Sequence, residues 1–398
     1  MRGVLQIVGV LFLCVLVFVL DSCSRGPVQY RDPYLDYVNH APKVHVGLSK
    51  LNNAKSAKIK LTDSSDVFYN DKKIAKISSD SSQITIIGNS LKLFGKSFTN
   101  FPIKIVSRDE FFIVNDKQYR GNLLIYLKNG SITYVNEIDM ENYLAGVLGK
   151  EMSTMYSTVD SLKSQAVAAR TYALHEIQSK RLRNAGEDFD LFDDERSQVY
   201  GGTEQESEKA FNIMESTRGL VLTFKNELIN TFYSSTCGGH TEPSWEVLEI
   251  PPKIEPLSGV PCPYCKDSKH FMWSAKFSKL EMGKKLTGKN KKVTKINISK
   301  KAKGGHALRI SVLIEGEKKE SDLHANLEFR RKLGPQNLKS TLFVEIKDIG
   351  DEFEIKGRGF GHGAGMCQVG AMQMGKEGFK FYDILNHYYP GSKLKKLY

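Results

Sequence analysis

The spacing of hydrophobic and polar residues changes along the chain. From Val44 to Tyr134, short alternating runs such as "KVHVGL", "SQITIIG" and "NLLIYLKNGSITYV" are separated by Asn, Asp, Ser and Gly. Alternation with a period of two predicts half-buried β-strands, and the Asn-Gly pair in "LKNGSITYV" is typical of a hairpin turn. We therefore expect a β-rich segment in this part of the chain.

Apolar residues then recur at helical spacing in "IDMENYLAGVLGKEM" and "TVDSLKSQAVAARTYALHEIQSKR". Ser157 or Thr158 is placed to cap the second helix, and Asp160 puts an acidic charge in its first turn. The apolar stripe of this helix consists of Leu162, Ala166, Ala169, Tyr172 and Ala173. This segment is the clearest helix in the sequence.

The rest of the chain mixes both patterns. A helical stretch, "EQESEKAFNIMEST", precedes the strand-like runs "GLVLTF" and "ELINTFYSST". Residues 292–357 return to strand-like runs, and "KFYDILNHYYPG" is helical up to its Pro-Gly turn. Strands and helices are segregated instead of alternating one for one, which predicts an α+β fold.

The N-terminus indicates export. An apolar run, Val4–Leu20, follows Met1-Arg2 and precedes "DSCSRG". This pattern is typical of a secretory signal, while the alternative is a retained anchor helix near the lower length limit for a membrane span. The ending resembles the bacterial lipoprotein box, in which Cys23 would be acylated. Both interpretations place the rest of the chain outside the cytoplasm, anchored at the membrane.

Composition and charge narrow the class of partner. With 40% hydrophobic and 26% charged residues the chain is globular and not disordered. Its net charge is +12, and residues 276–305 are rich in Lys. For an exported protein this charge points to an anionic cell envelope. No aromatic residues alternate with these lysines, so we expect no nucleic-acid partner.

Cysteine spacing suggests a metal site. Cys237 and His240 form a Cys-x2-His pair, and Cys262 and Cys265 form a Cys-x2-Cys pair. Such pairs direct two ligands each at one tetrahedral zinc ion, whose role would be structural because four protein ligands leave no position for water. Disulfides are also permitted outside the cytoplasm, so Cys237 could instead bridge to either partner of the second pair or to Cys367.

Two residues are candidates for chemistry. Glu151 lies in a break between helical segments beside Leu148, Met152 and Met155, where burial would raise its pKa toward that of a general acid. His362 stands in the Gly-rich segment "GRGFGHGAGMCQVGA", which brings backbone close to a ligand. The alternatives are a surface carboxylate at a helix end and a hydrogen-bonded structural histidine.

Two enzyme classes are excluded by their missing motifs. No G-x-S-x-G accompanies the segment "YSST", which argues against a serine hydrolase. "GRGFGHG" is not followed at once by a helix and lies in no βαβ unit, so it is not a dinucleotide loop.

Seven segments in order resemble the motifs of the SpoIID/LytB family of bacterial peptidoglycan proteins. They are "ENYLAGVLGKEM", "LKSQAVAARTYAL", "DERSQVYGG", "NTFYSSTCGGHTE", "GVPCPYCKDS", "FRRKLG" and "GRGFGHGAGMCQVGAMQMGKEGFKFYDILNHYYPG". The resemblance spans about residues 120–398. We divide the chain accordingly into a signal or anchor segment (1–22), a tether (23–43), a β-rich region (44–119) and a SpoIID/LytB-like domain (120–398).

The resemblance implies a mixed fold around a glycan-binding cleft and a lytic transglycosylase whose catalytic residue is Glu151. It also implies a non-catalytic alternative, in which the protein binds peptidoglycan and activates a cell-wall amidase. A third interpretation is a zinc-bearing envelope protein without glycan specificity. The residues implied to bind the glycan are Gln165, Arg170, Tyr172, Ser197, Gln198, Ser235, His362 and Gln368.

The sequence departs from the family pattern in two places. Many relatives have Pro beside the Glu-Met pair, where this chain has Lys150 and Ser153, and many have His in place of Ser234. The first change puts the rigidity of the Glu151 loop in doubt, and the second removes one donor from the implied cleft.

Overall fold

The computed structural model describes residues 40–49, 51, 56–78 and 80–398. The predicted signal or anchor segment, Cys23 and the tether up to residue 39 lie outside the described residues. All elements named below belong to one compact unit, Ala41–Tyr398. Within the described ranges, no helix is both long enough and apolar enough for a membrane crossing.

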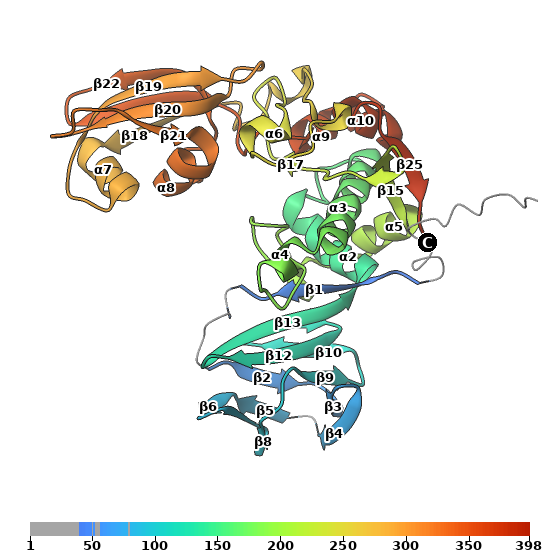
Figure 1. The fold of residues 1–398 in the computed structure, drawn as a ribbon. Helices are drawn as coiled ribbons and strands as arrows, with labels where there is room; N and C mark the ends of the chain where they lie inside the picture. The colour runs from blue at the N-terminus through green and yellow to red at the C-terminus, as the bar shows by residue number, and fades with distance from the viewer. Residues whose placement is uncertain (1–39, 50, 52–55, 79) are drawn as a thin grey trace, which may run out of the picture. The chain divides into compact units, whose positions relative to one another are not determined.

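Three sheets make up the first part of this unit (Figure 1). The largest has the order β14-β1-β13-β12-β9-β3-β4. Its strands are β1 (Lys43–Gly47), β3 (Ser65–Tyr69), β4 (Lys72–Ile77), β9 (Ile103–Ser107), β12 (Asn122–Lys128), β13 (Ser131–Asp139) and β14 (Leu191–Phe192). The smaller sheets are β11-β10-β2-β5 and β6-β7-β8. Their strands are β2 (Lys58–Leu61), β5 (Asp80–Gln83), β6 (Thr85–Ile87), β7 (Ser90–Leu93), β8 (Lys96–Phe98), β10 (Phe111–Val114) and β11 (Lys117–Arg120).

These sheets confirm the β-rich N-terminal segment and the predicted hairpin. β12 and β13 pair in antiparallel register with Lys128 opposite Ser131, and the turn between them is Asn129-Gly130. Both turn residues have positive φ, 51° and 74°, as a tight hairpin turn requires. The division of the chain at residue 119 stays a prediction, and the largest sheet contains strands from both sides of that position.

Helices follow the sheets along the chain. They are α2 (Met140–Glu151), α3 (Val159–Ser179), α4 (Arg181–Asn184), the 3-10 turn η2 (Gly202–Gln205) and α5 (Glu208–Ser216). Thr158 caps α3, because its side chain accepts a hydrogen bond from the Ser161 backbone N–H. The predicted stripe of α3 is buried, with Leu162, Ala166 and Ala173 all fully inaccessible.

Short elements surround these helices. β15 (Leu220–Phe224) pairs with β16 (Glu227–Leu228) and β25 (Lys393–Lys396), and β17 (Tyr233–Ser234) pairs in parallel with β24 (Met366–Cys367). The helices of this part are α6 (Ser244–Val247), η3 (Glu255–Leu257), η4 (Pro263–Cys265), α9 (Gln368–Lys376) and α10 (Phe381–Tyr388). As predicted, the last helix ends before the Pro390-Gly391 turn.

Residues 272–358 form a lobe around a hydrophobic cluster of their own, which includes Trp273, Phe329 and Ile355. Its two sheets are β18-β23-β22 and β19-β20-β21. We call residues 272–358, which are rich in Lys and Arg, the basic lobe. Its elements are β18 (Met272–Ser278), α7 (Lys279–Thr287), β19 (Val293–Lys301), β20 (Ala307–Ile314), β21 (Ser321–His324), the π-helix η5 (Ala325–Arg330), α8 (Arg331–Leu333), β22 (Leu342–Asp348) and β23 (Glu352–Arg358). The segregated helices and strands confirm the α+β class.

Candidate active site and cysteine cluster

Glu151 is the last residue of α2, and two donors hold its carboxylate. Oε1 accepts a hydrogen bond from the Val199 backbone N–H at 2.8 Å, and Oε2 accepts one from Gln368 Nε2 at 3.3 Å. Burial raises the pKa of this carboxyl above its usual value, although both hydrogen bonds act in the opposite direction. This carboxyl therefore stays protonated to a higher pH than that of an exposed Glu. Once it loses its proton, the two hydrogen bonds stabilise the negative charge of the carboxylate.

The backbone around Glu151 accounts for its position. Met152, with φ −143° and ψ 124°, leaves the helical conformation and is buried, so α2 stops directly after Glu151. The negative end of the helix dipole lies here, which disfavours a charged carboxylate. Of the neighbours expected to bury Glu151, Leu148 and Met152 are inaccessible, whereas Met155 is 79% exposed.

Three tyrosines surround the carboxyl. Burial, and with it the charge of Glu151, raises the pKa of Tyr143, Tyr172 and Tyr233, so their hydroxyls remain protonated donors. Gln198 organises two of them, because its Oε1 accepts from Tyr143 at 3.1 Å and its Nε2 donates to Tyr233 at 2.8 Å. The amide of Gln198 is 1% exposed and therefore orients tyrosines instead of reaching outward.

A second amide lies behind Gln368. Gln368 Nε2 also donates to Gln165 Oε1 at 3.4 Å. Gln165 is fully buried, and its own Nε2 has no hydrogen-bond partner among the described residues. A buried polar group without a partner is uncommon and marks a place for water or a ligand atom.

The structure places two predicted serines at the edge of this group. Ser197 Oγ accepts from the Phe192 backbone N–H at 3.1 Å and lies against the Tyr172 hydroxyl. The carbonyl of Ser235 accepts from the Val369 backbone N–H at 3.0 Å, which ties β17 to the start of α9. Tyr172 itself is 7% exposed.

His362 uses both ring nitrogens within the chain. Nδ1 accepts from the Ala364 backbone N–H at 3.0 Å, which places the proton on Nε2, and Nε2 donates to the Tyr233 carbonyl at 3.1 Å. Burial, with the charge of Arg330, lowers the pKa of His362 to about 4, so the ring is neutral. This geometry is typical of a hydrogen-bonded structural histidine. To bind substrate, the ring would have to give up one of its two hydrogen bonds within the chain.

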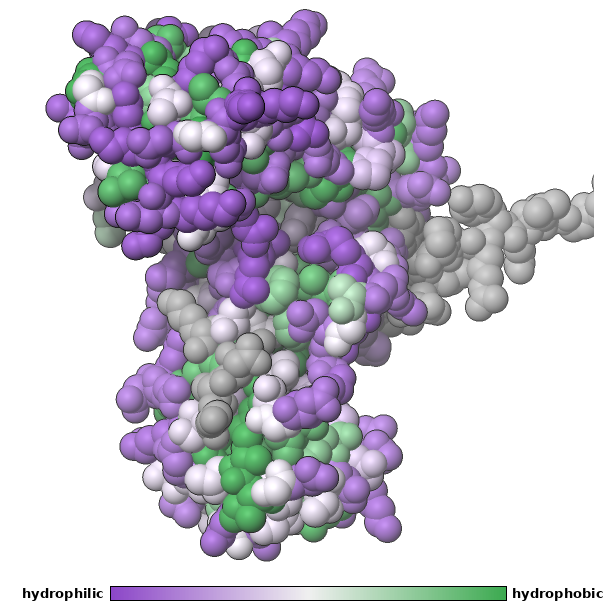
Figure 2. Space-filling model, turned by 60° about the vertical axis from the view of Figure 1, so that its left-hand side comes forward, coloured by the Kyte–Doolittle hydropathy of each residue, from purple (hydrophilic) through white to green (hydrophobic). Residues whose placement is uncertain are grey.

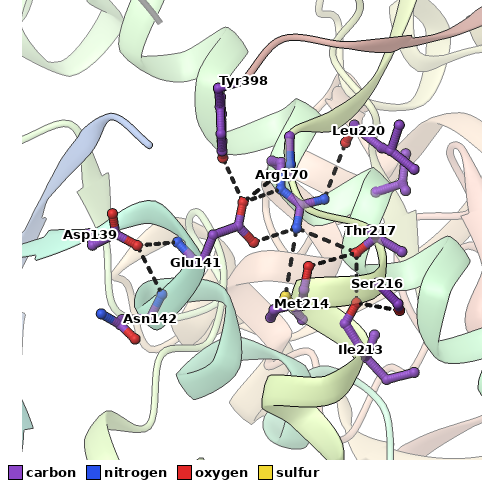
Figure 3. A network of polar contacts seen from close by, with 12 residues as sticks. Asp139, Glu141, Asn142, Arg170, Ile213, Met214, Ser216, Thr217, Leu220 and Tyr398 are labelled. Atoms are coloured by element: carbon purple, nitrogen blue, oxygen red, sulfur yellow. Dashed lines mark hydrogen bonds and ion pairs between the residues drawn. The ribbon is translucent and has the colours of Figure 1, made fainter. Parts of the chain in front are cut away.

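Arg170 does not lie where the sequence predicted, and its assignment as a substrate-binding residue needs correction. Its side chain is completely buried, and Nε donates to Glu141 Oε1 at 2.9 Å. It also donates to the Leu220 carbonyl at 3.1 Å, while the Tyr398 hydroxyl donates to the same Glu141 oxygen at 2.7 Å (Figure 3). A guanidinium with no accessible surface cannot contact a glycan, so Arg170 links α3, α2 and β15.

The cysteines form a buried cluster whose membership differs from the prediction. Cys237, Cys262, Cys265 and Cys367 place their sulfur atoms within 4.8 Å of one another, and these four thiols are the cysteine cluster. His240 is not part of it, because its Nδ1 faces the Thr241 carbonyl. The Gly238-Gly239 turn, with φ of 81° and 123°, separates His240 from Cys237.

The cysteine cluster fits a tetrahedral metal. Cys237 and Cys265 sulfurs are 3.6 Å apart, and ligands at about 2.3 Å from a zinc ion lie about 3.8 Å from one another in a tetrahedron. The four groups are all thiols and are all buried, a donor set that binds soft metals. Among the described residues, this is the group of His, Cys, Asp and Glu side chains that could hold a metal ion.

The cysteine cluster is linked to the carboxyl of Glu151 through two adjacent residues, Cys367 and Gln368. Cys367 directly precedes Gln368, and its sulfur accepts from the Gly370 backbone N–H at 3.4 Å as the N-cap of α9. The residue that donates to Glu151 therefore begins a helix whose cap belongs to the cysteine cluster.

Sequence reasoning missed Tyr143, Val199 and Tyr233, and it named Cys367 only as a possible disulfide partner of Cys237. Tyr143 lies eight residues before Glu151, a helical spacing that returns to the same face and could have identified it. Val199 contributes only its backbone N–H, which no side-chain pattern can indicate. No other Cys or His lies two or three residues from Cys367, so its spacing does not mark it as a metal ligand.

Comparisons with known proteins identify families and relatives that this chain resembles in sequence. The family described as Stage II sporulation protein (SpoIID) matches residues 128–224, and a Domain of unknown function (DUF8618) matches residues 264–365. An uncharacterized protein of Brachyspira hyodysenteriae is 34% identical over 284 residues, which cover 70% of this chain and 73% of that protein. Stage II sporulation protein D of Bacillus subtilis is 31% identical over 276 residues, covering 66% and 76%. The amidase enhancer of the same species is 30% identical over 302 residues, covering 63% and 40%.

Proposed function

Because the chain belongs to the SpoIID/LytB family, we propose that it acts on the bacterial cell wall and cleaves peptidoglycan glycan strands as a lytic transglycosylase. The observation that carries this proposal is the state of Glu151. Its carboxyl has a raised pKa and also two donors that stabilise its ionised form. A group of this kind can act first as an acid and then as a base.

In the proposed reaction, protonated Glu151 donates its proton to the glycosidic oxygen between N-acetylmuramic acid and N-acetylglucosamine. The bond between this oxygen and muramoyl C1 breaks as oxocarbenium character develops at C1. Ionised Glu151 then takes the proton of the muramoyl C6 hydroxyl, whose oxygen forms the new bond to C1. The products are a 1,6-anhydro-muramoyl end and a free N-acetylglucosamine hydroxyl.

The described neighbours of Glu151 suit both halves of this cycle. Val199 N–H and Gln368 Nε2 stabilise the carboxylate after the first proton transfer. The half-buried Tyr233 offers its hydroxyl to sugar oxygens or to acetamido groups. The substrate supplies its own nucleophile, so this route needs no second carboxylate, whereas hydrolysis would need one.

We assign a structural zinc ion to the cysteine cluster, with Cys367 in place of His240 as the fourth ligand. The ion would hold together the start of α9, the turn after Cys237 and η4. Four thiolate ligands leave no position for substrate or water, so the ion would take no part in the reaction. Metal analysis of the purified, reduced protein tests this assignment, and mapped disulfides among these cysteines with no bound zinc would contradict it.

The similarity to a protein named amidase enhancer favours a second candidate function. In this alternative the protein binds glycan strands and activates a cell-wall amidase without cutting the strands. Export and membrane attachment, through an acylated Cys23 or an anchor helix within residues 4–20, suit both functions.

The deciding experiment incubates protein from residue 24 onward with purified glycan strands, with and without stem peptides, followed by mass spectrometry. Glu151→Gln is the matched control, since it keeps the size of the side chain but removes the acidic proton. Anhydro-muramoyl products that disappear in this variant support the transglycosylase. Reducing ends would indicate hydrolysis, and intact strands that remain bound would favour the amidase activator.

A further inference from the structure

A buried carboxylate joins the basic lobe to the rest of the unit. Hydrophilic residues cover most of the upper part of the view in Figure 2, where this lobe lies, as expected of a solvated surface. Glu242, which lies after β17 and outside the basic lobe, is by contrast completely buried. Burial of a charged carboxylate is unfavourable unless hydrogen bonds satisfy it, so the partners of Glu242 show what this residue holds in place.

The partners of this carboxylate belong to a turn of the basic lobe, residues 302–306 between β19 and β20. Oε1 accepts hydrogen bonds from the backbone N–H and the ring Nδ1 of His306, both at 3.1 Å, and Oε2 accepts one from the Gly304 backbone N–H at 3.0 Å. His240 Nδ1, 4.0 Å from Oε2, is too distant for a hydrogen bond. Burial acts to raise the pKa of Glu242, but His306 and the backbone N–H groups outweigh it and hold the pKa below its usual value.

The ring of His306 is oriented by Glu242 and packs against the Gly-rich segment. Because an ionised carboxylate only accepts, Nδ1 carries a proton of the ring. His306 is 1% exposed, and its Nε2 has no hydrogen-bond partner among the described residues. A Cβ atom at Gly363 would lie only 2.7 Å from this Nε2, and the φ of 79° at Gly363 also favours glycine. The ring and the backbone of residue 363 are therefore in close contact.

The backbone of Glu242 binds the same Gly-His-Gly segment, residues 361–363. Its N–H donates to the Gly363 carbonyl at 2.8 Å, and residues 242 and 364 form a parallel β-bridge. The next residue back, His362, donates from Nε2 to the Tyr233 carbonyl at 3.1 Å. Glu242 thus binds the turn of the basic lobe with its side chain and the Gly-His-Gly segment with its backbone, and that segment in turn holds Tyr233.

Two residues connect this arrangement to Glu151. The pKa of Tyr233 is raised by burial and then by the charge of Glu151, so the two groups are near neighbours. Gln368, five residues after Gly363, donates to Glu151 Oε2 at 3.3 Å. A displacement of Gly363 would therefore change the place of both donors, and donors in an active site lose their effect when they are displaced by about 1 Å.

We propose that Glu242 and His306 are positioning residues for the Glu151 site. The ionised carboxylate locks residues 302–306 of the basic lobe against Gly363, and this contact sets the places of Tyr233 and Gln368. Glu242 and His306 have almost no accessible surface, so they act through the Gly-His-Gly segment and not on the substrate. The inference rests on the proposed function, because it assumes that the site around Glu151 cleaves glycan strands.

The first test compares two substitutions of His306 in the exported chain from residue 24 onward. Asn places an amide N–H near the position of Nδ1 and keeps the bond to Glu242, whereas Leu keeps only the bulk of the ring. We expect His306→Leu to lower kcat for strand cleavage about tenfold with little change in KM, and His306→Asn to stay close to the parent. Equal losses in both variants would mean that Nε2 is required, which would overturn the proposal.

The second test replaces the carboxylate. Glu242→Gln keeps the shape of the side chain but turns an amide NH2 toward an N–H donor, so kcat should fall by a similar factor. Asp190 offers a matched control outside the Glu151 site, because its Oδ2 accepts from the backbone N–H and the Nδ1 of His45, both at 3.1 Å. Asp190→Asn should lower Tm but leave kcat of the folded protein unchanged. Equal losses of kcat in the two variants would indicate a general loss of stability and would refute the positioning role.

A readout that needs no cleavage separates this proposal from the proposed function. In 15N NMR spectra of labelled protein the ring nitrogens of His362 report their hydrogen bonds, and His362→Gln identifies their signals among the nine histidines. We expect Glu242→Gln and His306→Leu to shift these signals, and Asp190→Asn and His306→Asn to leave them in place. The two His306 variants decide the question if Glu242→Gln does not fold.

The two proposals can therefore fail separately. Shifted His362 signals in Glu242→Gln, in a protein whose parent releases no anhydro-muramoyl product, would keep the positioning role and refute the transglycosylase. Cleavage by the parent, together with unmoved His362 signals and an unchanged kcat in Glu242→Gln, would do the reverse.

Discussion

Replacing Arg170 by Met tests whether this residue serves the fold instead of the substrate. The change leaves Glu141 buried, 7% exposed, without its cation. Breaking a buried pair by removing one partner costs about 3–5 kcal/mol. An unfolding entropy of about 2.1 cal/mol/K per residue over the unit Ala41–Tyr398 converts each kcal/mol into about 1.3 °C of Tm. We therefore expect a fall in Tm of roughly 4–7 °C, measured by circular dichroism.

The double variant Arg170→Met with Glu141→Leu is the matched control. It removes both charges, so no unpaired ion stays buried, and we expect it to regain much of the lost Tm. The reasoning would be refuted by an Arg170→Met variant that melts like the parent protein but no longer binds glycan oligosaccharides. That result would return Arg170 to the substrate-binding residues.

The cysteine cluster and the candidate acid give three more predictions. Cys367→Ser should lower the metal content of the purified protein, measured by atomic emission, whereas His240→Ala should not; equal metal content in both would argue against the assignment. Because burial raises the pKa of Glu151, the protonated form that starts the reaction persists to higher pH than in an exposed Glu, and the cleavage rate should fall as pH rises through that raised pKa. A rate that increases over this range would contradict Glu151 as the acid. Gln368→Leu removes a donor to the carboxylate, so the pKa of Glu151 should rise further and the alkaline limb of the pH profile should move to higher pH; an unmoved limb would show that this hydrogen bond does not matter.

Local features of the fold could be predicted from the sequence because they depend on neighbouring residues. The Asn129-Gly130 turn and the Thr158 cap each follow from the conformational preference of one or two residues. The position of Glu151 at a helix end was visible for the same reason, in the change of apolar spacing after Leu148. Such signals need no knowledge of the rest of the chain.

The contacts that complete the site join distant parts of the chain, and no local pattern encodes them. Cys367 is 130 residues from Cys237, and Gln368 is 217 residues from Glu151. Arg170 was assigned to the substrate from its motif, yet its partner Glu141 lies on another helix and only tertiary packing buries both. The order of motifs thus indicates which residues belong to the family pattern. Tertiary burial then determines whether such a residue is able to contact a ligand or supports the fold.

The Glu141–Tyr398 hydrogen bond has a consequence for the order of folding. It joins residues 257 positions apart, and β25 pairs beside it with β15. The start of the helix that carries Glu151 is therefore completed by one of the most distant segments of the polypeptide. Contacts with such large sequence separation form late, because the intervening chain must first be ordered. During synthesis or export, the helix that carries Glu151 would therefore lack part of its final contacts until β25 and Tyr398 had packed against β15 and Glu141.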